Sequence, residues 1–338
     1  MNYKTVVLLL VGIGILAAMV LYIGPGQIES AWKTANPWYV ALAIVIQFII
    51  YAMWNQRWAI TIHSLQISIK KRHIFPMLMV GLAVNNITPS ARGGGEPIRA
   101  YMLGKYTKAP MENAFATVIA DRGLDTFPFV VLAILTIIFS VLYFNLPDWV
   151  VLALIISLVA LVIVFILVMY MSINNAAGEK ITLWIVGLVK RFSKRKHFEI
   201  ERRAIEAMRG FQGSMRVMIR DRPVLMYGLP ISFLVWFMEI IRVYIVFSAF
   251  GTPVPLGIIA AVFVIATLMG LIPLLPGGIG AVDGVMIILY SAAGVPPSIS
   301  AAATIIERLI SFWMTSFIGI AMIPYVGSEV MEKLSDKF

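Results

Sequence analysis

The chain has 338 residues, of which 60% are hydrophobic and only 13% are charged. Soluble domains are nearer half apolar and a quarter charged, so this composition excludes an ordinary soluble protein and indicates an integral membrane protein. The chain contains no cysteine, which excludes disulfides, and its net charge of +10 fits the cytoplasmic loops of a membrane protein better than a nucleic-acid surface.

The first half, residues 1–172, is predicted to contain full spans and one interrupted apolar segment. The predicted spans are Thr5–Ile23, Pro37–Ile62, Glu112–Phe144 and Trp149–Met171. The first of these follows Lys4, is long for a signal peptide and has no convincing cleavage site, so we expect it to be retained. The apolar arms of residues 75–102 are too short to cross, and glycines and prolines break them, which predicts a re-entrant hairpin of two half-helices.

Residues 173–223 are predicted to form a basic cytoplasmic linker. Apolar residues recur there near the helical period, with arginines between them, which predicts an amphipathic helix on the membrane surface. The apolar positions are Ile205, Met208, Phe211, Met215 and Met218. The second half, residues 224–338, is predicted to hold the spans Leu225–Phe250 and Ser300–Val326, with a second glycine-broken hairpin at about 256–297 between them.

Basic residues predict the orientation, because they collect on the cytoplasmic side. Lys4, the 63–74 loop, the 92–112 segment, the linker and the tail lie on one side, and only Lys33 lies on the other. We therefore expect a multi-pass protein of the cell membrane with both termini in the cytoplasm. The predicted fold is an all-α polytopic membrane protein with six to eight transmembrane helices and two re-entrant hairpins.

The two hairpins resemble each other. Pro89-x-x-x-Gly93-Gly94 matches Pro273-x-x-x-Gly277-Gly278, and about 30 residues later 116–122 (ATVIADR) matches 303–308 (ATIIER) with a one-residue gap. The first hairpin is expected to enter from the cytoplasm and the second from outside, which predicts an internal inverted repeat. In transporters, paired broken helices of this kind mark the substrate site.

Charged residues at membrane depth mark functional sites by default, and here they gather around the two hairpins. The candidate substrate-binding residues are Asn86, Thr88, Pro89, Arg92, Gly93, Gly94, Glu96, Arg99, Asp121, Arg122, Asp125, Glu239, Arg242, Pro276, Gly277, Gly278, Asp283, Glu307 and Arg308. Glu239 and Arg242 are three residues apart and share a helix face, so they are expected to pair. Internal ion pairs that only hold the spans together are the alternative for these charges.

Arginines beside a helix break favour a phosphate-bearing ligand. Freed backbone N–H groups, a half-helix N-terminus and the forked guanidinium all bind phosphate oxygens. The glycines lack the Gly-Lys-Ser/Thr of a nucleotide-binding loop. A lipid phosphate fits better than a soluble one, because the apolar surroundings accommodate acyl or prenyl chains.

These motifs resemble the lysylphosphatidylglycerol synthase/flippase transmembrane family over nearly the whole chain. The resemblance rests on Asn86-x-Thr88-Pro89-x3-Gly93-Gly94-x-Glu96-Pro97-x-Arg99-x-Tyr101, on Pro276-Gly277-Gly278-Ile279-Gly280-x2-Asp283, and on Glu307-Arg308. In the synthases this membrane unit is the flippase part, and a separate soluble domain transfers the amino acid. The chain ends about ten residues after its last predicted span. The resemblance therefore implies lipid translocation without aminoacylation.

The predicted function is a flippase-like transporter of an anionic phospholipid or a polyprenyl-phosphate-linked lipid. Its expected partners are membrane lipids and not nucleic acid, with no cofactor and no metal, and a homo-oligomer stays open. Two alternatives remain: an intramembrane glycosyl- or phosphoryl-transferase acting on a prenyl-phosphate lipid, and an auxiliary subunit of glycan or lipid machinery. Metal or nucleotide dependence would distinguish the enzyme from the transporter.

Overall fold

The computed structural model describes residue 14 and residues 17–88, 93–143, 148–192, 197–270 and 276–335, and all regular structure within them is helical. The elements are α2 (Pro25–Thr34), α3 (Pro37–Ser64), α4 (Lys71–Ile87), α5 (Gly95–Thr107), α6 (Met111–Tyr143), α7 (Asp148–Ile173), α8 (Asn175–Phe192), α9 (His197–Arg220), η1 (Val224–Gly228), α10 (Leu229–Ser248), α11 (Leu256–Gly270), η2 (Pro276–Gly278), α12 (Ala281–Ala292), α13 (Pro297–Arg308), η3 (Leu309–Met314) and α14 (Thr315–Ser335).

Five helical segments within the described residues are long and apolar enough to cross a membrane. They are Pro37–Ser64, Met111–Phe139, Ile155–Ile173, Val224–Ser248 and Pro297–Gly327. They correspond to the predicted spans after the first one, so the all-helical membrane fold is confirmed. The predicted first span, Thr5–Ile23, lies mostly outside the described residues.

The start of α3 shows how local sequence sets a helix boundary. The Asn36 side chain accepts a hydrogen bond from the backbone N–H of Trp38 at 3.0 Å, and Pro37 occupies the first helical position. An asparagine cap satisfies a backbone donor that the helix leaves free, and proline there sacrifices no hydrogen bond. The helix therefore begins at the residue where the apolar run begins.

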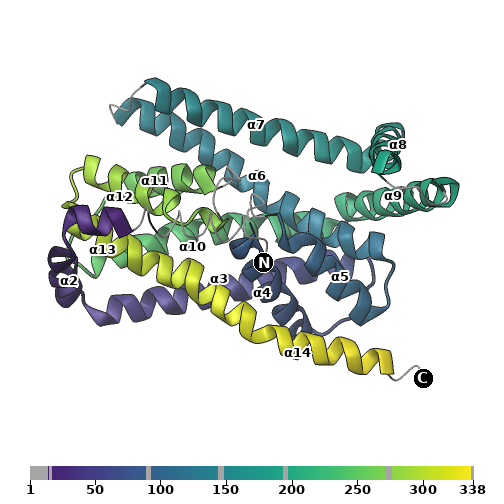
Figure 1. The fold of residues 1–338 in the computed structure, drawn as a ribbon, viewed down its shortest axis with the longest axis horizontal. Helices are drawn as coiled ribbons and strands as arrows, with labels where there is room; N and C mark the ends of the chain where they lie inside the picture. Colours follow the sequence, from purple (N-terminus) through teal and green to yellow (C-terminus); the bar gives the residue numbers. More distant parts are fainter. Residues whose placement is uncertain are drawn as a thin grey trace.

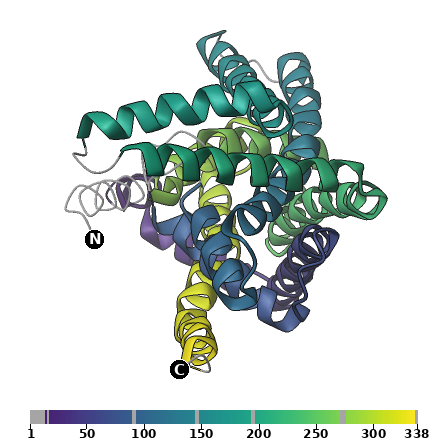
Figure 2. The same cartoon turned by 90° about the vertical axis from the view of Figure 1, so that its right-hand side faces the viewer.

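The long helices lie along one axis, and two helices cross its end. In Figure 1 the spans run broadly along the horizontal, with α2 at one end and α9 at the other. Figure 2 looks at that second end, where α8 and α9 run side by side across the ends of the spans. The C-terminal end of α14 extends toward this same end, whereas α2 and the start of α3 lie at the opposite end (Figure 1).

Two pairs of short helices occupy the positions of the predicted hairpins. α4 and α5 pack together in the half of the molecule near α9, and α11 and α12 pack together in the half near α2 (Figure 1). α4 has 17 residues and α11 has 15. At 1.5 Å per residue these helices are about 22–26 Å long, shorter than the roughly 30 Å apolar core of a bilayer.

The linker contains two helices, α8 and α9, rather than the single helix expected. The apolar side of α9 packs on protein, because Met215 and Met218 are buried against Ala116 and Ala120 of α6. The expectation that this stripe faces the membrane surface is therefore wrong for Met215 and Met218. Exposed apolar side chains lie on α8, among them Trp184, and at other positions of α9, among them Val217.

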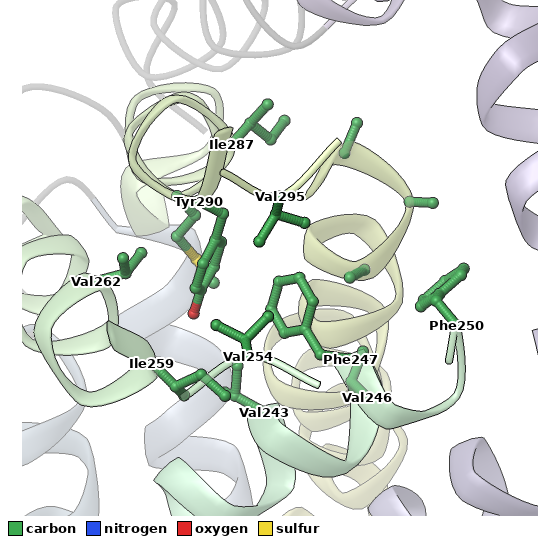
Figure 3. Close-up of a cluster of buried hydrophobic side chains, with 14 of the residues drawn as sticks. Val243, Val246, Phe247, Phe250, Val254, Ile259, Val262, Ile287, Tyr290 and Val295 are labelled. Carbon is green, nitrogen blue, oxygen red and sulfur yellow. The ribbon is translucent and has the colours of Figure 1, made fainter. Parts of the chain in front are cut away.

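The largest cluster of buried apolar side chains holds the second half together. Figure 3 shows Val243 and Phe247 of α10 against Tyr290 of α12, with Ile259 of α11 beside them. The ring centroids of Phe247 and Tyr290 lie 4.5 Å apart. This packing fixes α10, α11, α12 and α13 relative to one another, and these helices supply the second half of the central site.

Candidate functional site

Residues that flank the two helix breaks lie close together. Gly277, in η2, has a φ of 57°, and a Cβ on it would lie only 2.7 Å from the carbonyl oxygen of Asn86 in α4. A Cβ on Gly95, at the start of α5, would lie 1.9 Å from the carbonyl oxygen of Gly81. Glycine is therefore required at both positions, because any side chain would push the backbones apart.

A network of ion pairs surrounds Asp121 of α6, which is only 2% exposed. Arg57 of α3 donates to it from Nε, and Arg99 of α5 donates from Nη2, each over 2.8 Å. Arg57 also donates to Asp125 from Nη1 at 2.5 Å. The guanidinium of Arg99 lies 4.0 Å above the ring of Trp58. Since unpaired buried charges are costly, this pairing allows two arginines to lie at membrane depth.

Arg122, the next residue of α6, is anchored to the start of α5. Its Nε donates to Oε1 of Glu96 at 2.6 Å, and Asn85 donates to the same oxygen at 3.1 Å. Asn85 in turn accepts a 2.6 Å hydrogen bond from the backbone N–H of Gly95. Glu96 and Asn85 thus tie α4, α5 and α6 together at the break.

A second network surrounds Arg242 of α10, which is fully buried. It donates to Glu307 of α13 from Nη2 at 2.8 Å and pairs with Glu239 through Nη1 at 2.5 Å. The predicted pairing of Glu239 with Arg242 is confirmed. Arg242 also donates to the side chain of Gln47 in α3. Its Nε–H has no hydrogen-bond partner among the described residues.

Arg308 is anchored to the start of α12 in the same way that Arg122 is anchored to α5. Its Nε donates to Asp283 at 2.8 Å, and its Nη2 donates to the carbonyl oxygen of Gly277 at 3.1 Å. Asp283 also accepts from the backbone N–H of Gly280 at 2.7 Å. In both halves, then, an acidic residue at the start of a short helix holds the arginine of the acid–arginine pair.

The two networks touch through α3 and α10, which pack against each other. Arg57 of α3 donates to Ser232 of α10 at 3.2 Å, while Arg242 of α10 donates to Gln47 of α3. Ser232 and Gln47 each lie ten residues before the arginine of their own helix. The contact is thus reciprocal between the two helices.

A cavity of about 170 Å³ lies where the two halves meet, lined by side chains from both. Arg122 and Arg308 both line it, together with Arg242, Asp125 and Glu239. The Arg122 side chain is 31% exposed, and that of Arg308 is 10% exposed. Trp236, Phe263 and Phe312 add aromatic surface. The volume equals that of about six water molecules in the liquid, enough for a small polar group.

The predicted site residues divide into cavity-lining and supporting groups. Those that line the cavity are Asn86, Arg122, Asp125, Glu239, Arg242, Glu307 and Arg308. Those that pair with arginine or aspartate around it are Glu96, Arg99, Asp121 and Asp283.

The remaining predicted residues lie at the breaks. Thr88 donates to the Val84 carbonyl of its own helix at 2.7 Å, Gly93 and Gly94 precede α5, and Gly278 lies in η2 with Gly277. Pro89 and Arg92 lie outside the described residues, as does the side chain of Pro276.

The list of candidate substrate-binding residues left out several polar residues of the site. Gln47, Arg57, Asn85 and Ser232 all take part in the networks. Gln47 and Arg57 are polar residues inside a predicted span, which was an available signal. Ser232 carried no comparable signal, since serine is common in membrane helices and bonds its own backbone there.

Comparison with known proteins finds one family that covers almost the whole chain. Residues 8–319 match the family described as the lysylphosphatidylglycerol synthase TM region. A UPF0104 membrane protein of Methanothermobacter thermautotrophicus is 60% identical over 337 residues, which is all of both chains. Another of Methanocaldococcus jannaschii is 29% identical, covering 98% of this chain and 97% of its own. The glycosyltransferase AglD of Haloferax volcanii is 22% identical over 87% of this chain and half of its own length.

Proposed function

Because the chain belongs to the lysylphosphatidylglycerol synthase transmembrane family, we propose that it is a lipid transporter. It moves an anionic phospholipid or a polyprenyl-phosphate-linked lipid between the leaflets of the membrane. The observation that carries this proposal is the central cavity with an arginine from each half, Arg122 and Arg308. Two guanidiniums on one small cavity suit the oxygens of a phosphate, which accept several hydrogen bonds at once.

An accessible guanidinium and apolar walls support a lipid phosphate. Arg122 is the most exposed arginine of the cavity, so its guanidinium can donate to an acceptor on the ligand. Trp236, Phe263 and Phe312 offer apolar surface to the first atoms of the lipid chains.

We also propose that the two pairs of short helices are re-entrant hairpins of an inverted repeat. The support is the matched anchoring of Arg122 by Glu96 and of Arg308 by Asp283. Two hairpins from opposite ends, meeting near mid-membrane, allow broken backbone to line a polar cavity rather than face lipid.

The basic end of the molecule is assigned to the cytoplasm. The arginines of α9 lie at the end where α8 and α9 cross the spans, while Lys33 lies on α2 at the other end (Figure 1). Positive residues are retained on the cytoplasmic side during insertion, which supports a cytoplasmic C-terminus.

A second candidate function is an intramembrane transferase acting on a prenyl-phosphate lipid. It is favoured by the relative named glycosyltransferase AglD, although the match covers only half of that protein. The same arginines would then hold the lipid phosphate. The two proposals differ in what they require, because a transferase needs a donor substrate and a transporter does not.

Reconstitution into liposomes tests the proposal. The purified chain is incorporated with headgroup-labelled anionic lipid, and loss of the inner-leaflet label to an impermeant quencher gives the rate of movement. Arg122→Gln and Arg308→Gln should each slow it about tenfold or more, since a hydrogen bond to a charged group contributes about 1.5–3 kcal/mol. Arg209→Gln, whose exposed side chain pairs with Glu179, is the matched control and should leave the rate unchanged.

Two results would count against transport. If both cavity variants fold and move lipid at the rate of the unaltered chain, the cavity is not the site. If the chain modifies a prenyl-phosphate lipid, and does so only when Mg²⁺ and a sugar nucleotide are added, the transferase is correct.

A further inference from the structure

α7 marks the level of the membrane surface at the basic end of the molecule. In the most apolar stretch of its segment Ile155–Ile173, only 6% of the residues are buried inside the protein. An apolar helix with so little protein around it requires lipid on its exposed sides. α7 ends at Ile173 and α8 begins at Asn175, so α8 starts at the level where this span leaves the lipid.

α9 fixes the corner between α7 and α8. The side-chain amide of Gln212 donates to the carbonyl oxygens of Met171 and Asn174, at 2.7 and 2.8 Å. Arg216 donates from Nη2 to the carbonyl oxygen of Ile173 at 2.9 Å. The last carbonyls of a helix have no partner within it, so these bonds stabilise the end of α7. From this corner α8 runs across the ends of the spans instead of continuing α7 (Figures 1 and 2).

One face of α8 packs on protein. Gly178, Thr182 and Val186 recur every four residues and are all buried. A Cβ on Gly178 would clash with the side chain of Gln212, so this face lies in close contact with α9. Among the described elements, α8 packs mainly against α9 and the end of α7. Its other faces therefore meet the surroundings of the protein.

Apolar residues lie along one of these outer faces. Ile181 is half-buried and Ile185 is 47% exposed, and the four residues between them place both on the same side of α8. In the sequence the helical spacing continues to Leu188 and Phe192. Trp184, which is 65% exposed, lies at the edge of this stripe. The exposed Lys180 lies four residues before Trp184 and thus on the same edge. An apolar stripe with tryptophan and lysine at its edge is typical of a helix in a lipid surface.

The charge of this region favours an anionic lipid surface as the partner. Residues 175–220 contain eleven lysines and arginines against four acidic residues, a net charge of +7 out of the +10 of the whole chain. Basic segments at the end of a span attract anionic headgroups. We propose that α8 lies in the headgroup layer of the leaflet at the basic end, with Trp184 and Ile185 inserted into it, and that anionic lipid strengthens this contact. The surface lies outside the cavity, so α8 has this position in a transporter and in a transferase alike.

Single-cysteine labelling is suited to the test, because the natural chain contains no cysteine. Ile185→Cys lies on the apolar stripe. Gly187→Cys is the matched control, because two residues turn a helix by about 200° and a Cβ on Gly187 would meet no atom within 4 Å. Each full-length variant carries an environment-sensitive fluorophore on its cysteine and is reconstituted into vesicles of phosphatidylcholine, with or without phosphatidylglycerol. The quencher is a phospholipid with a spin label near its headgroup.

The label at Ile185→Cys should be quenched by this lipid at least about twofold more than the label at Gly187→Cys, since only the first enters the headgroup layer. The difference should grow when phosphatidylglycerol is present, because the basic segment is then drawn toward the surface. Ile181→Cys, on the same side of α8, replaces Ile185→Cys if that variant does not fold.

Three results would overturn the proposal. Equal lipid quenching of the two labels would show that the stripe does not enter the headgroup layer. Protection of both labels from the lipid quencher and from aqueous iodide would show that protein covers α8. Quenching of the Ile185→Cys label that is the same with and without phosphatidylglycerol would refute the role of anionic lipid. None of these results depends on lipid crossing the membrane, so the proposed function and the position of α8 can fail separately.

Discussion

Replacing Asp121 by asparagine removes the carboxylate that two buried arginines share. Arg57 and Arg99 each donate to it over 2.8 Å, and all three side chains are no more than 3% exposed. The asparagine side chain would keep the shape and one acceptor oxygen but lose the negative charge. The substitution therefore tests electrostatics with little change in packing.

The expected loss in the free energy of unfolding depends on which partners each arginine retains. Arg57 keeps Asp125, at 2.5 Å, and Ser232. Arg99 keeps its contact with the ring of Trp58 but loses the ion pair that it makes with Asp121. Breaking a buried ion pair costs about 3–5 kcal/mol, and Arg99 accounts for most of it here.

Glu307→Gln is the informative comparison in the second half. Arg242 retains Glu239 at 2.5 Å and the side chain of Gln47 when Glu307 loses its charge. The expected loss in the free energy of unfolding is therefore about 1.5–3 kcal/mol, the contribution of one hydrogen bond to a charged group.

The assay is equilibrium unfolding in mixed micelles, with the free energy of unfolding measured by helical circular dichroism. Glu29→Gln, which breaks the exposed pair with Lys33, serves as the control and should cost less than about 1 kcal/mol. The reasoning is refuted if Asp121→Asn is as stable as this control. It is also refuted if Glu307→Gln is the more damaging of the two buried changes.

Two further predictions concern packing. Gly95→Ala would place a Cβ 1.9 Å from the Gly81 carbonyl oxygen, so we expect loss of folded protein on size-exclusion chromatography. Gly187→Ala is the control and should elute unchanged, because its Cβ would meet no neighbouring atom within 4 Å. Equal elution of the two variants would contradict the close approach of Gly95 to Gly81. Met215→Ala, at a buried site between α9 and α6, should lower the free energy of unfolding by about 2–5 kcal/mol, against less than about 0.5 kcal/mol for the exposed Val217→Ala. Similar losses for both would show that α9 is not packed on α6.

Much of the fold follows from local patterns that the sequence carries. Runs of about 20 apolar residues predict spans whatever their neighbours are, and the glycines between residues 88 and 95 predict a break because they cannot sustain a helix. The pairing of Glu239 with Arg242 was predictable for the same reason, since residues three apart on one helix always share a face.

Only the tertiary structure decided which partners these elements meet. Asp121 is 64 residues from Arg57, and helical periodicity says which side of α6 Asp121 occupies but not which helix lies opposite. The same limit explains Met215, whose helix face was predictable but whose neighbour is α6 rather than lipid. An apolar stripe needs an apolar surface to cover it, and a buried charge needs an opposite charge to pair with. The three-dimensional packing of the helices determines which neighbour supplies each of them. For the site, this packing placed Arg122 on the cavity and Arg99 behind it.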